Sequence, residues 1–157
     1  MASTLIIIPT YNEAENIQGL LKKLITLYKD IDILIVDDAS PDSTSIKVKE
    51  LTQKYPQILL KERQGKGGRG SAVLAGFTYG LQHSYKYFIE MDADFSHRPE
   101  EITLLLEKIT TCDMVIGSRY LPGSKIYAWG IKRTIFSYLA NAFARCMLGI
   151  PISDYTN

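Results

Sequence analysis

The sequence has no long apolar run, few cysteines and almost no net charge, and each of these absences excludes a class of protein. The apolar runs within the 157 residues are as short as Leu5–Ile8, so no stretch of about 18 apolar residues is available to span a bilayer. No basic stretch precedes that first run, so residues 1–30 lack the pattern of a signal peptide. A net charge of +1 gives no reason to expect bulk attraction to nucleic acid.

Cysteine and histidine, the residues that most often bind metals or carry out catalysis, are also scarce. Cys112 and Cys146 lie far apart, without CxxC or other metal-ligand spacing. We expect reduced, semi-buried thiols in a cytosolic protein. His83 and His97 have no partner pattern, so we expect surface or capping positions for both rather than catalytic ones.

What is present is a regular alternation of short apolar runs with longer amphipathic segments. Such short runs, bounded by turn residues, are typical of buried parallel strands. Amphipathic stripes predict helices over residues 17–28, 73–81 and 99–109. The order predicts an α/β fold, an open, mostly parallel twisted sheet with helices on both faces, in a single domain over residues 1–157. The predicted strands are Leu5–Ile8, Ile33–Val36, Ile58–Leu60, Tyr87–Met91 and Met114–Gly117.

Polar residues follow four of these five strands. Pro9–Glu13 follows the first strand and Asp37–Ser40 the second, while Asp92–Asp94 follows the fourth and Ser118–Tyr120 the fifth. Ligands of open α/β sheets bind beyond the carboxyl ends of the strands. The sequence therefore predicts a binding site at this edge, where several carboxylates and Arg119 meet.

The pair Asp92 and Asp94 predicts a metal site. Residues two apart at a strand end direct their side chains to the same side of the sheet. Two adjacent carboxylates repel each other unless a cation lies between them or one is protonated. Mg²⁺ and Mn²⁺ prefer oxygen ligands, and Mg²⁺ usually combines one or two carboxylates with substrate phosphates. The alternative is a solvated pair in the turn before the helix that begins near Pro99.

The acids after the first two strands fit either a nucleotide pocket or local capping. The segment that begins with Asp37-Asp38 is rich in turn formers and would cap the next helix, or one carboxylate would accept hydrogen bonds from a base or ribose. Thr10 and Glu13 fit a capping box, in which Glu13 reaches back to the backbone of the cap residue. Glu13 would equally reach a nucleotide, and Tyr11 would stack on a base. Both interpretations stay open.

The glycine-rich segment Gly65–Gly70 matches the GxGxxG pattern of dinucleotide-binding proteins, and Glu90 lies about 20 residues further on. A nicotinamide-dependent oxidoreductase is therefore an alternative. Two facts oppose it: the pattern belongs in the first strand-to-helix turn, where this chain has no glycine, and Glu90 falls within a predicted strand. The other interpretations are a loop that brings backbone and Lys66 to a phosphate, or a flexible loop.

Residues 127–152 contain an apolar stripe with basic residues at its start. Packing of this stripe on the domain core is the favoured prediction. The alternatives are contact with a membrane surface, and presentation of Arg133 to an anionic headgroup. The stripe consists of Ile135, Leu139, Phe143 and Met147, and Lys132 and Arg133 precede it.

Three segments, taken together, are more specific than any single motif: Ile8–Ile17, Val36–Thr44 and Met91–Pro99. They resemble glycosyltransferase family 2, which has the GT-A fold, and within it the dolichyl-phosphate or polyprenyl-phosphate mannosyltransferases. The resemblance runs in order along essentially the whole chain. Three later segments agree with it, namely Gly117–Tyr120, Tyr127–Arg133 and Ser153–Thr156.

The resemblance implies roles for individual positions. Asp92 and Asp94 would bind Mg²⁺ or Mn²⁺, although some members use a Gln at the position of Ser96 as a third ligand. Asp94 and Arg119 would be catalytic, and Arg119, Arg133 and Ser137 would hold the phosphate of the lipid acceptor or the sugar-phosphate end of the donor. With Lys66 added from the glycine-rich segment, the residues expected to bind the nucleotide-sugar are Pro9, Tyr11, Glu13, Val36, Asp38, Lys66, Asp92, Ala93, Asp94 and Arg119.

The apparent lack of a catalytic base also fits a phosphate acceptor. Inverting transfer to a sugar hydroxyl needs a carboxylate to take the proton. A monophosphate already carries a charge of about −1.5 to −2 at neutral pH and needs no such base. We therefore predict metal-dependent, inverting transfer of a hexose to a phosphate acceptor, and the resemblance implies mannose from GDP-mannose and a polyprenyl or dolichyl phosphate.

The expected location is the cytoplasm, with peripheral contact at the cytoplasmic face of a membrane and no nucleic-acid partner. One alternative is a family 2 transferase that uses a UDP-sugar and a hydroxyl acceptor. Another is a non-catalytic module that binds nucleotide-sugars. Because relatives continue past the Ser153–Thr156 segment, we expect the domain to continue beyond Asn157.

Overall fold

The computed structural model describes residues 3–120, 131–150, 152, 154 and 155, apart from the side chains of residues 131 and 133. The chain divides into two compact units, Met1–Glu100 and Glu101–Asn157. The single catalytic domain expected over residues 1–157 stays a prediction.

The first unit contains a four-stranded, fully parallel sheet with the strand order β3-β2-β1-β4. The register pairs Thr10 with Asp37 and Asp37 with Glu62, so three strands end at the same edge of the sheet. Four of the predicted strands are thereby confirmed, with small shifts at their ends. They are β1 (Thr4–Thr10), β2 (Asp32–Asp37), β3 (Ile58–Glu62) and β4 (Tyr87–Glu90).

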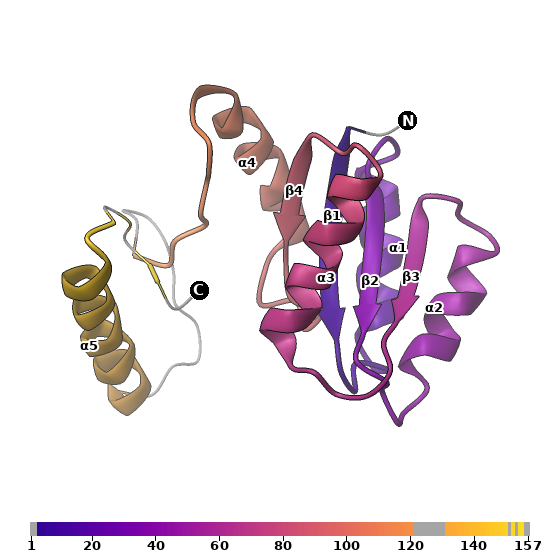
Figure 1. Ribbon diagram of the computed structural model, residues 1–157, viewed down its shortest axis with the longest axis horizontal. Coiled ribbons are helices and arrows are strands. Elements are labelled where there is room, and N and C mark those ends of the chain that lie inside the picture. The colour runs from indigo at the N-terminus through magenta and orange to yellow at the C-terminus, as the bar shows by residue number, and fades with distance from the viewer. Residues whose placement is uncertain (1–2, 121–130, 151, 153, 156–157) are drawn as a thin grey trace. The chain divides into compact units, whose positions relative to one another are not determined.

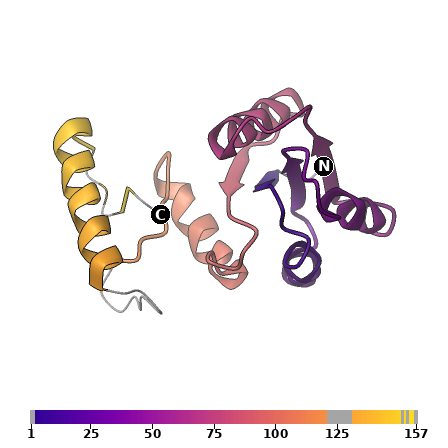
Figure 2. The same ribbon diagram turned by 90° about the horizontal axis from the view of Figure 1, so that it is seen from below.

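Helices cover both faces of this sheet, as predicted. Figures 1 and 2 show α3 (Arg69–Gln82) on one face, and α1 (Ile17–Leu27) and α2 (Thr44–Thr52) on the other. The central strands are buried on both faces, which explains why β1 and β2 are almost continuously apolar. Leu5, Ile7, Leu34, Val36 and Ala72 form one cluster of this core.

The contact between α3 and the sheet depends on two glycines of the helix. A Cβ atom built at Gly76 would overlap the side chain of Ile7, and one built at Gly80 would overlap that of Phe88. Ile7 is fully buried and has little room to move. The absence of side chains at both positions therefore lets the helix approach β1 and β4 closely.

The close approach of α3 to the sheet predicts that adding one methyl group to this helix contact destabilises the fold. Gly76→Ala should lower the free energy of unfolding by about 1–3 kcal/mol, the usual cost of overpacking a core. Gly70→Ala on the same helix is the matched control, because a Cβ atom there meets nothing within 4 Å. Urea denaturation of both variants checks the prediction. Equal stability of the two would show that α3 adjusts its position at no cost.

The second unit is helical in its described part. It contains α4 (Ile102–Lys108), the 3-10 turn η2 (Ile109–Thr111) and α5 (Ile131–Leu148). The 3-10 turn η1 (Pro99–Glu101) precedes α4, so the predicted helix beginning at Pro99 is confirmed with an initial tighter turn.

The predicted fifth strand, Met114–Gly117, is wrong. This segment has no regular secondary structure, and Met114 is 64% exposed. All strands of the described sheet lie within residues 4–90. An apolar run marks a segment that can be buried, but a strand also needs a partner edge to satisfy its backbone hydrogen bonds.

Further predictions for the second unit concern the two cysteines and the apolar stripe of α5. Cys112 and Cys146 are free thiols, but both are exposed rather than semi-buried. The four apolar side chains of the α5 stripe are each more than half exposed and are not covered within this unit. Their packing on a core stays a prediction. Among the described helices, none is long and apolar enough to cross a membrane.

Candidate functional site

A cavity of about 280 Å³ lies in the first unit, at the edge where β1, β2 and β4 end. Its wall comes from the end of β1, from the segments that follow β1, β2 and β4, from the glycine-rich loop after β3 and from the start of α3. Of the predicted donor-binding residues, eight line it: Pro9, Tyr11, Glu13, Asp38, Lys66, Asp92, Ala93 and Asp94. Thr10, Gly68, Arg69 and Ala72, which were not predicted, complete the lining.

Four predicted site residues are not part of this lining. Val36 is fully buried in the core cluster below the sheet surface and does not line the cavity. Arg119, Arg133 and Ser137 belong to the second unit. The side chain of Arg133 lies outside the described part of the chain, as do residues 121–130, which carry part of the family resemblance.

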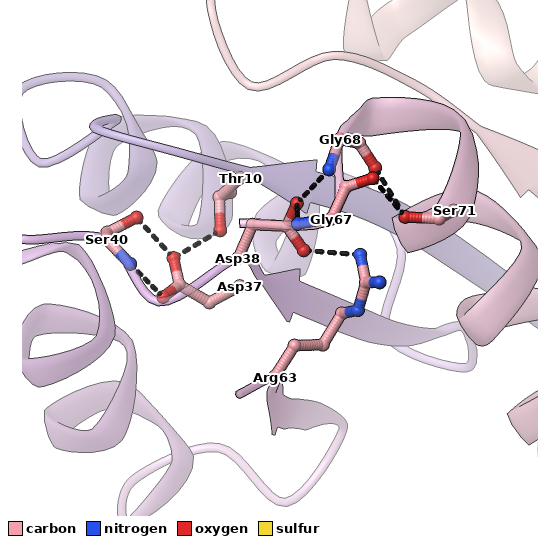
Figure 3. Close-up of polar contacts among 8 residues, drawn as sticks. All are labelled: Thr10, Asp37, Asp38, Ser40, Arg63, Gly67, Gly68 and Ser71. Atoms are coloured by element: carbon pink, nitrogen blue, oxygen red, sulfur yellow. Dashed lines mark hydrogen bonds and ion pairs between the residues drawn. The ribbon is translucent and has the colours of Figure 1, made fainter. Parts of the chain in front are cut away.

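Asp37 is a structural carboxylate that joins two strand ends. It is 1% exposed and accepts hydrogen bonds from the Thr10 hydroxyl at 2.8 Å and from the Ser40 backbone N–H at 2.9 Å (Figure 3). The cap residue of α1 is Asn16, so a capping box formed by Thr10 and Glu13 is wrong. Glu13 instead accepts a hydrogen bond from the Asn16 side chain at 3.0 Å.

Asp38 holds the glycine-rich loop in place. One carboxylate oxygen accepts hydrogen bonds from the backbone N–H groups of Gly67 and Gly68, at 3.0 and 2.7 Å, and the other pairs with Arg63 (Figure 3). Gly68 has a φ of 87°, a conformation that L side chains rarely adopt. The glycines therefore serve to present backbone donors to Asp38, and contact of this carboxylate with a nucleotide stays a prediction.

This geometry also opposes the nicotinamide alternative. The GxGxxG segment follows β3, which is an edge strand, whereas the turn after β1 contains no glycine. Glu90, the acid at the expected distance, pairs with Arg69. A dinucleotide fingerprint would instead lie in the first strand-to-helix turn and direct its acid to a ribose.

Asp92 and Asp94 both line the cavity after the end of β4. Partial burial alone would raise the pKa of Asp94, but hydrogen bonds from the Ser96 hydroxyl and backbone N–H, and the nearby His97, hold it below the ordinary value. Asp94 is therefore anionic at neutral pH. The Asp92 backbone N–H donates to Nδ1 of His97 at 3.0 Å, which gives that histidine a structural role in this turn.

Arg69, the first residue of α3, joins Asp92 to Glu90. Its Nε donates to Asp92 at 2.9 Å, and its Nη2 pairs with Glu90. Partial burial alone would lower the pKa of Arg69, but the hydrogen bond to Asp92 and the charges of Asp92 and Glu90 raise it above the ordinary value. The sequence patterns predict no role for Arg69. The signal that would have revealed it is a basic residue at a helix start, where the helix dipole disfavours positive charge.

Two more cavity residues contact each other at the outer edge. The Nζ atom of Lys66 lies 3.8 Å from the centroid of the Tyr11 ring, a cation–π contact. Tyr11 is 37% exposed. Lys66 therefore lies over one face of a ring that is still partly open to solvent.

In the second unit, Arg119 and Asp154 form a two-pronged ion pair. The backbone N–H, Nε and Nη2 of Arg119 all donate to the Asp154 carboxylate, at 3.1, 2.8 and 2.8 Å. The pKa of Arg119 is raised, chiefly by these hydrogen bonds. Ser137 is nearly buried and shares a 2.7 Å hydrogen bond with the Tyr120 hydroxyl. The catalytic role of Arg119 and the acceptor role of Ser137 stay predictions.

The cavity fits a hard divalent cation that shares its shell with a ligand. Among the described residues, no group of three or more His, Cys, Asp or Glu side chains could enclose a metal ion. Mg²⁺ and Mn²⁺ do not require such a cage, because one or two carboxylates combined with phosphate oxygens and water suffice for Mg²⁺. Asp92 and Asp94 would supply these carboxylates, whereas structural zinc sites are built mainly from Cys and His.

Comparison with known proteins identifies the class of fold first. The open parallel sheet matches glycosyltransferases of the GT-A fold, which confirms the predicted fold class. A mannosyltransferase of Pyrobaculum calidifontis, solved with GDP-mannose and Mn²⁺, aligns with a TM-score of 0.54 at 23% identity, over 68% of this chain and 32% of its own. TarS of Staphylococcus aureus (residues 1–349) aligns with a TM-score of 0.54 at 22% identity, over the same shares.

The family follows from the sequence. Residues 5–156 match Glycosyl transferase family 2, and the chain belongs to this family. An undecaprenyl-phosphate mannosyltransferase of Micrococcus luteus is 42% identical over 97% of this chain and 63% of its own length. A polyprenol monophosphomannose synthase of Mycolicibacterium smegmatis is 43% identical over 98% of this chain and 58% of its own. The chain thus spans about 60% of the length of these relatives.

Proposed function

We propose that this protein transfers mannose from GDP-mannose to a polyprenyl phosphate, with inversion at the anomeric carbon. The observation that carries the proposal is the cavity at the carboxyl end of the sheet, whose lining combines Asp92 and Asp94 with Lys66 and Arg69. This combination suits a metal-bound diphosphate better than a neutral ligand. The relatives at 42% and 43% identity are named for mannosyl transfer to polyprenyl phosphates, which supports the sugar and the acceptor.

The donor fits the lining of the cavity. Tyr11 offers a ring for the base, and Glu13 offers an acceptor for base or ribose donors. Asp92 and Asp94 would hold Mg²⁺ or Mn²⁺, which when bound supplies positive charge to the diphosphate leaving group. A carboxylate binds a cation in its deprotonated form, and the hydrogen bonds from Ser96 favour this form of Asp94.

The transfer needs no general base from the protein. A phosphate oxygen of the acceptor forms the new bond to the anomeric carbon, while the bond from that carbon to the donor diphosphate breaks and GDP leaves with the electron pair. The acceptor oxygen is already anionic, so no proton has to be removed. The work of the chain is then to position the reactants and to stabilise charge on the leaving diphosphate. We place this reaction at the cytoplasmic face of a membrane, where a polyprenyl phosphate presents its headgroup.

A thermal-shift panel tests the donor. GDP-mannose with Mn²⁺ should raise the melting temperature by several degrees at saturating concentration, since a ligand at about 100 times its Kd adds roughly 2.7 kcal/mol of stability. The shift should disappear with EDTA. The panel includes UDP-glucose, dTDP-glucose and NADH. Stabilisation by UDP-glucose alone, or by NADH without metal, would contradict the proposal.

The acceptor is tested separately, with radiolabelled GDP-mannose. The label should pass to a polyprenyl phosphate in detergent but not to a free polyprenol, which has the same chain without the phosphate. Transfer to the polyprenol would show that the protein activates a hydroxyl, and the proposed acceptor would then be wrong. Donor binding with no transfer to either would identify a nucleotide-sugar-binding module.

A further inference from the structure

Arg69 occupies a position in its helix that is electrostatically unfavourable for a positive charge, so other contacts must stabilise it there. It is the first residue of α3, where the partial positive charge of the helix start disfavours a cation. Gly68 before it has a φ of 87°, which fixes the direction in which the helix begins. The compensation comes from Glu90, the last residue of β4, and from Asp92 beyond it, which both pair with its guanidinium.

The same contacts give Asp92 a cationic partner within the cavity. Arg69 and Asp92 both line the cavity, whereas Glu90 does not. The side chain of Arg69 is 51% exposed and that of Asp92 is 32% exposed, so neither is locked in a core. One carboxylate oxygen of Asp92 is thus engaged by a guanidinium at the place where the proposed function requires a divalent cation.

We propose that Arg69 and the divalent cation exchange at Asp92, so that the cation binds well only together with the donor diphosphate. This inference rests on the proposed function, because it assigns the cation to Asp92 and Asp94. In the donor-free protein, Arg69 neutralises Asp92. When the donor binds, its diphosphate gives the guanidinium a new two-pronged anionic partner and Asp92 becomes available to the cation.

Electrostatics explains why the exchange needs both ligands. A divalent cation beside the guanidinium would face direct repulsion at a separation of a few ångströms. The diphosphate relieves that repulsion because it supplies negative charge to both cations. Glu90 keeps Arg69 near the cavity after Asp92 is released. By linkage, the cation must then improve donor binding by the same factor as the donor improves cation binding.

Mn²⁺ titrations followed by electron paramagnetic resonance of the free ion test the exchange without any measurement of activity. For the native protein we expect Mn²⁺ binding to tighten on the order of tenfold when GDP is added, within the usual range for two coupled ligands. Arg69→Gln should bind Mn²⁺ several-fold more tightly than the native protein without GDP. The further increase in Mn²⁺ affinity when GDP is added should be smaller for Arg69→Gln than for the native protein.

Lys66→Gln is the matched control. It removes one positive charge from the same loop but leaves the partner of Asp92 in place, because Lys66 contacts Tyr11. We expect a smaller change in GDP-free Mn²⁺ affinity than for Arg69→Gln. Arg69→Lys keeps the positive charge but loses the two-pronged geometry of the guanidinium. Its GDP-free Mn²⁺ affinity should therefore lie between those of the native protein and Arg69→Gln. If Arg69→Gln does not fold, the test rests on the Mn²⁺ affinity of Arg69→Lys and on the effect of GDP on Mn²⁺ binding by the native protein.

The results that would overturn this inference differ from the result that would overturn the proposed function. Equal Mn²⁺ affinity of the native protein with and without GDP would overturn the exchange, and so would equal effects of Arg69→Gln and Lys66→Gln. The proposed function fails on a different result, namely unchanged Mn²⁺ affinity of Asp92→Asn in the presence of GDP.

Discussion

Asn in place of Asp94 is expected to lower the turnover of mannosyl transfer by about 10²–10³-fold, the usual effect of removing one group that stabilises charge in a transition state. The substitution keeps the shape of the side chain and removes its negative charge. Asp94 lines the cavity, and its anionic form is favoured by the hydrogen bonds from Ser96. An uncharged amide would bind the cation more weakly, so less positive charge would reach the leaving diphosphate.

The measurement is kcat and KM for GDP-mannose as a function of Mn²⁺ concentration. Asp30→Asn is the control, since it makes the same change at an exposed carboxylate that does not line the cavity. Turnover should fall for Asp94→Asn alone, and additional Mn²⁺ should restore it in part. Full activity of Asp94→Asn at low Mn²⁺ would exclude a metal role for this residue.

The sequence predicts the sheet well because its signal is local. The core strands are short apolar runs flanked by polar or turn-forming residues, so β1 to β4 lie within a few residues of their predicted bounds. The segment 114–117 has the same apolar signal but forms no strand. Partner edges cannot be read from one run of residues, and for that reason this prediction failed.

The cavity was predictable for a related reason. In a parallel sheet, position along each strand determines which residues reach a common edge. The acids and Tyr11 could therefore be grouped without knowledge of the contacts between them. Those contacts could not be predicted: Asp37 ties strand ends, Asp38 holds the glycine loop and Arg69 binds Asp92. Each depends on side-chain direction, which periodicity does not contain.

The segment that ends the described chain shows how a motif can have a structural role beside a predicted catalytic one. The backbone N–H of Tyr155 donates to the Asn141 side chain, and Asn141 in turn donates to the carbonyl of Ser137 one turn earlier in α5. Asp154, next to Tyr155, binds Arg119. Three segments distant in sequence are thereby joined around α5, which brings Arg119 and Ser137 into one polar network of the second unit.

Replacement of Asp154 by Ala is expected to destabilise this second unit by about 3 kcal/mol, the lower end of the cost of breaking a buried ion pair. The Asp154 side chain is fully buried, whereas that of Arg119 is 26% exposed. In the variant the guanidinium would lose two hydrogen bonds and its charge partner while still largely shielded from water. The partial exposure of Arg119 lets water replace some of this loss, so we expect the lower value.

Hydrogen exchange resolves the effect by unit. Amides of α5 should lose protection in Asp154→Ala, while those of β1 should keep it, because β1 belongs to the other unit. Asp113→Ala is the control, an exposed carboxylate in the same unit. If α5 is equally protected in both variants, the Arg119–Asp154 pair does not hold this unit together. If donor affinity also falls in Asp154→Ala alone, the pair additionally positions Arg119 for its predicted contact with the donor.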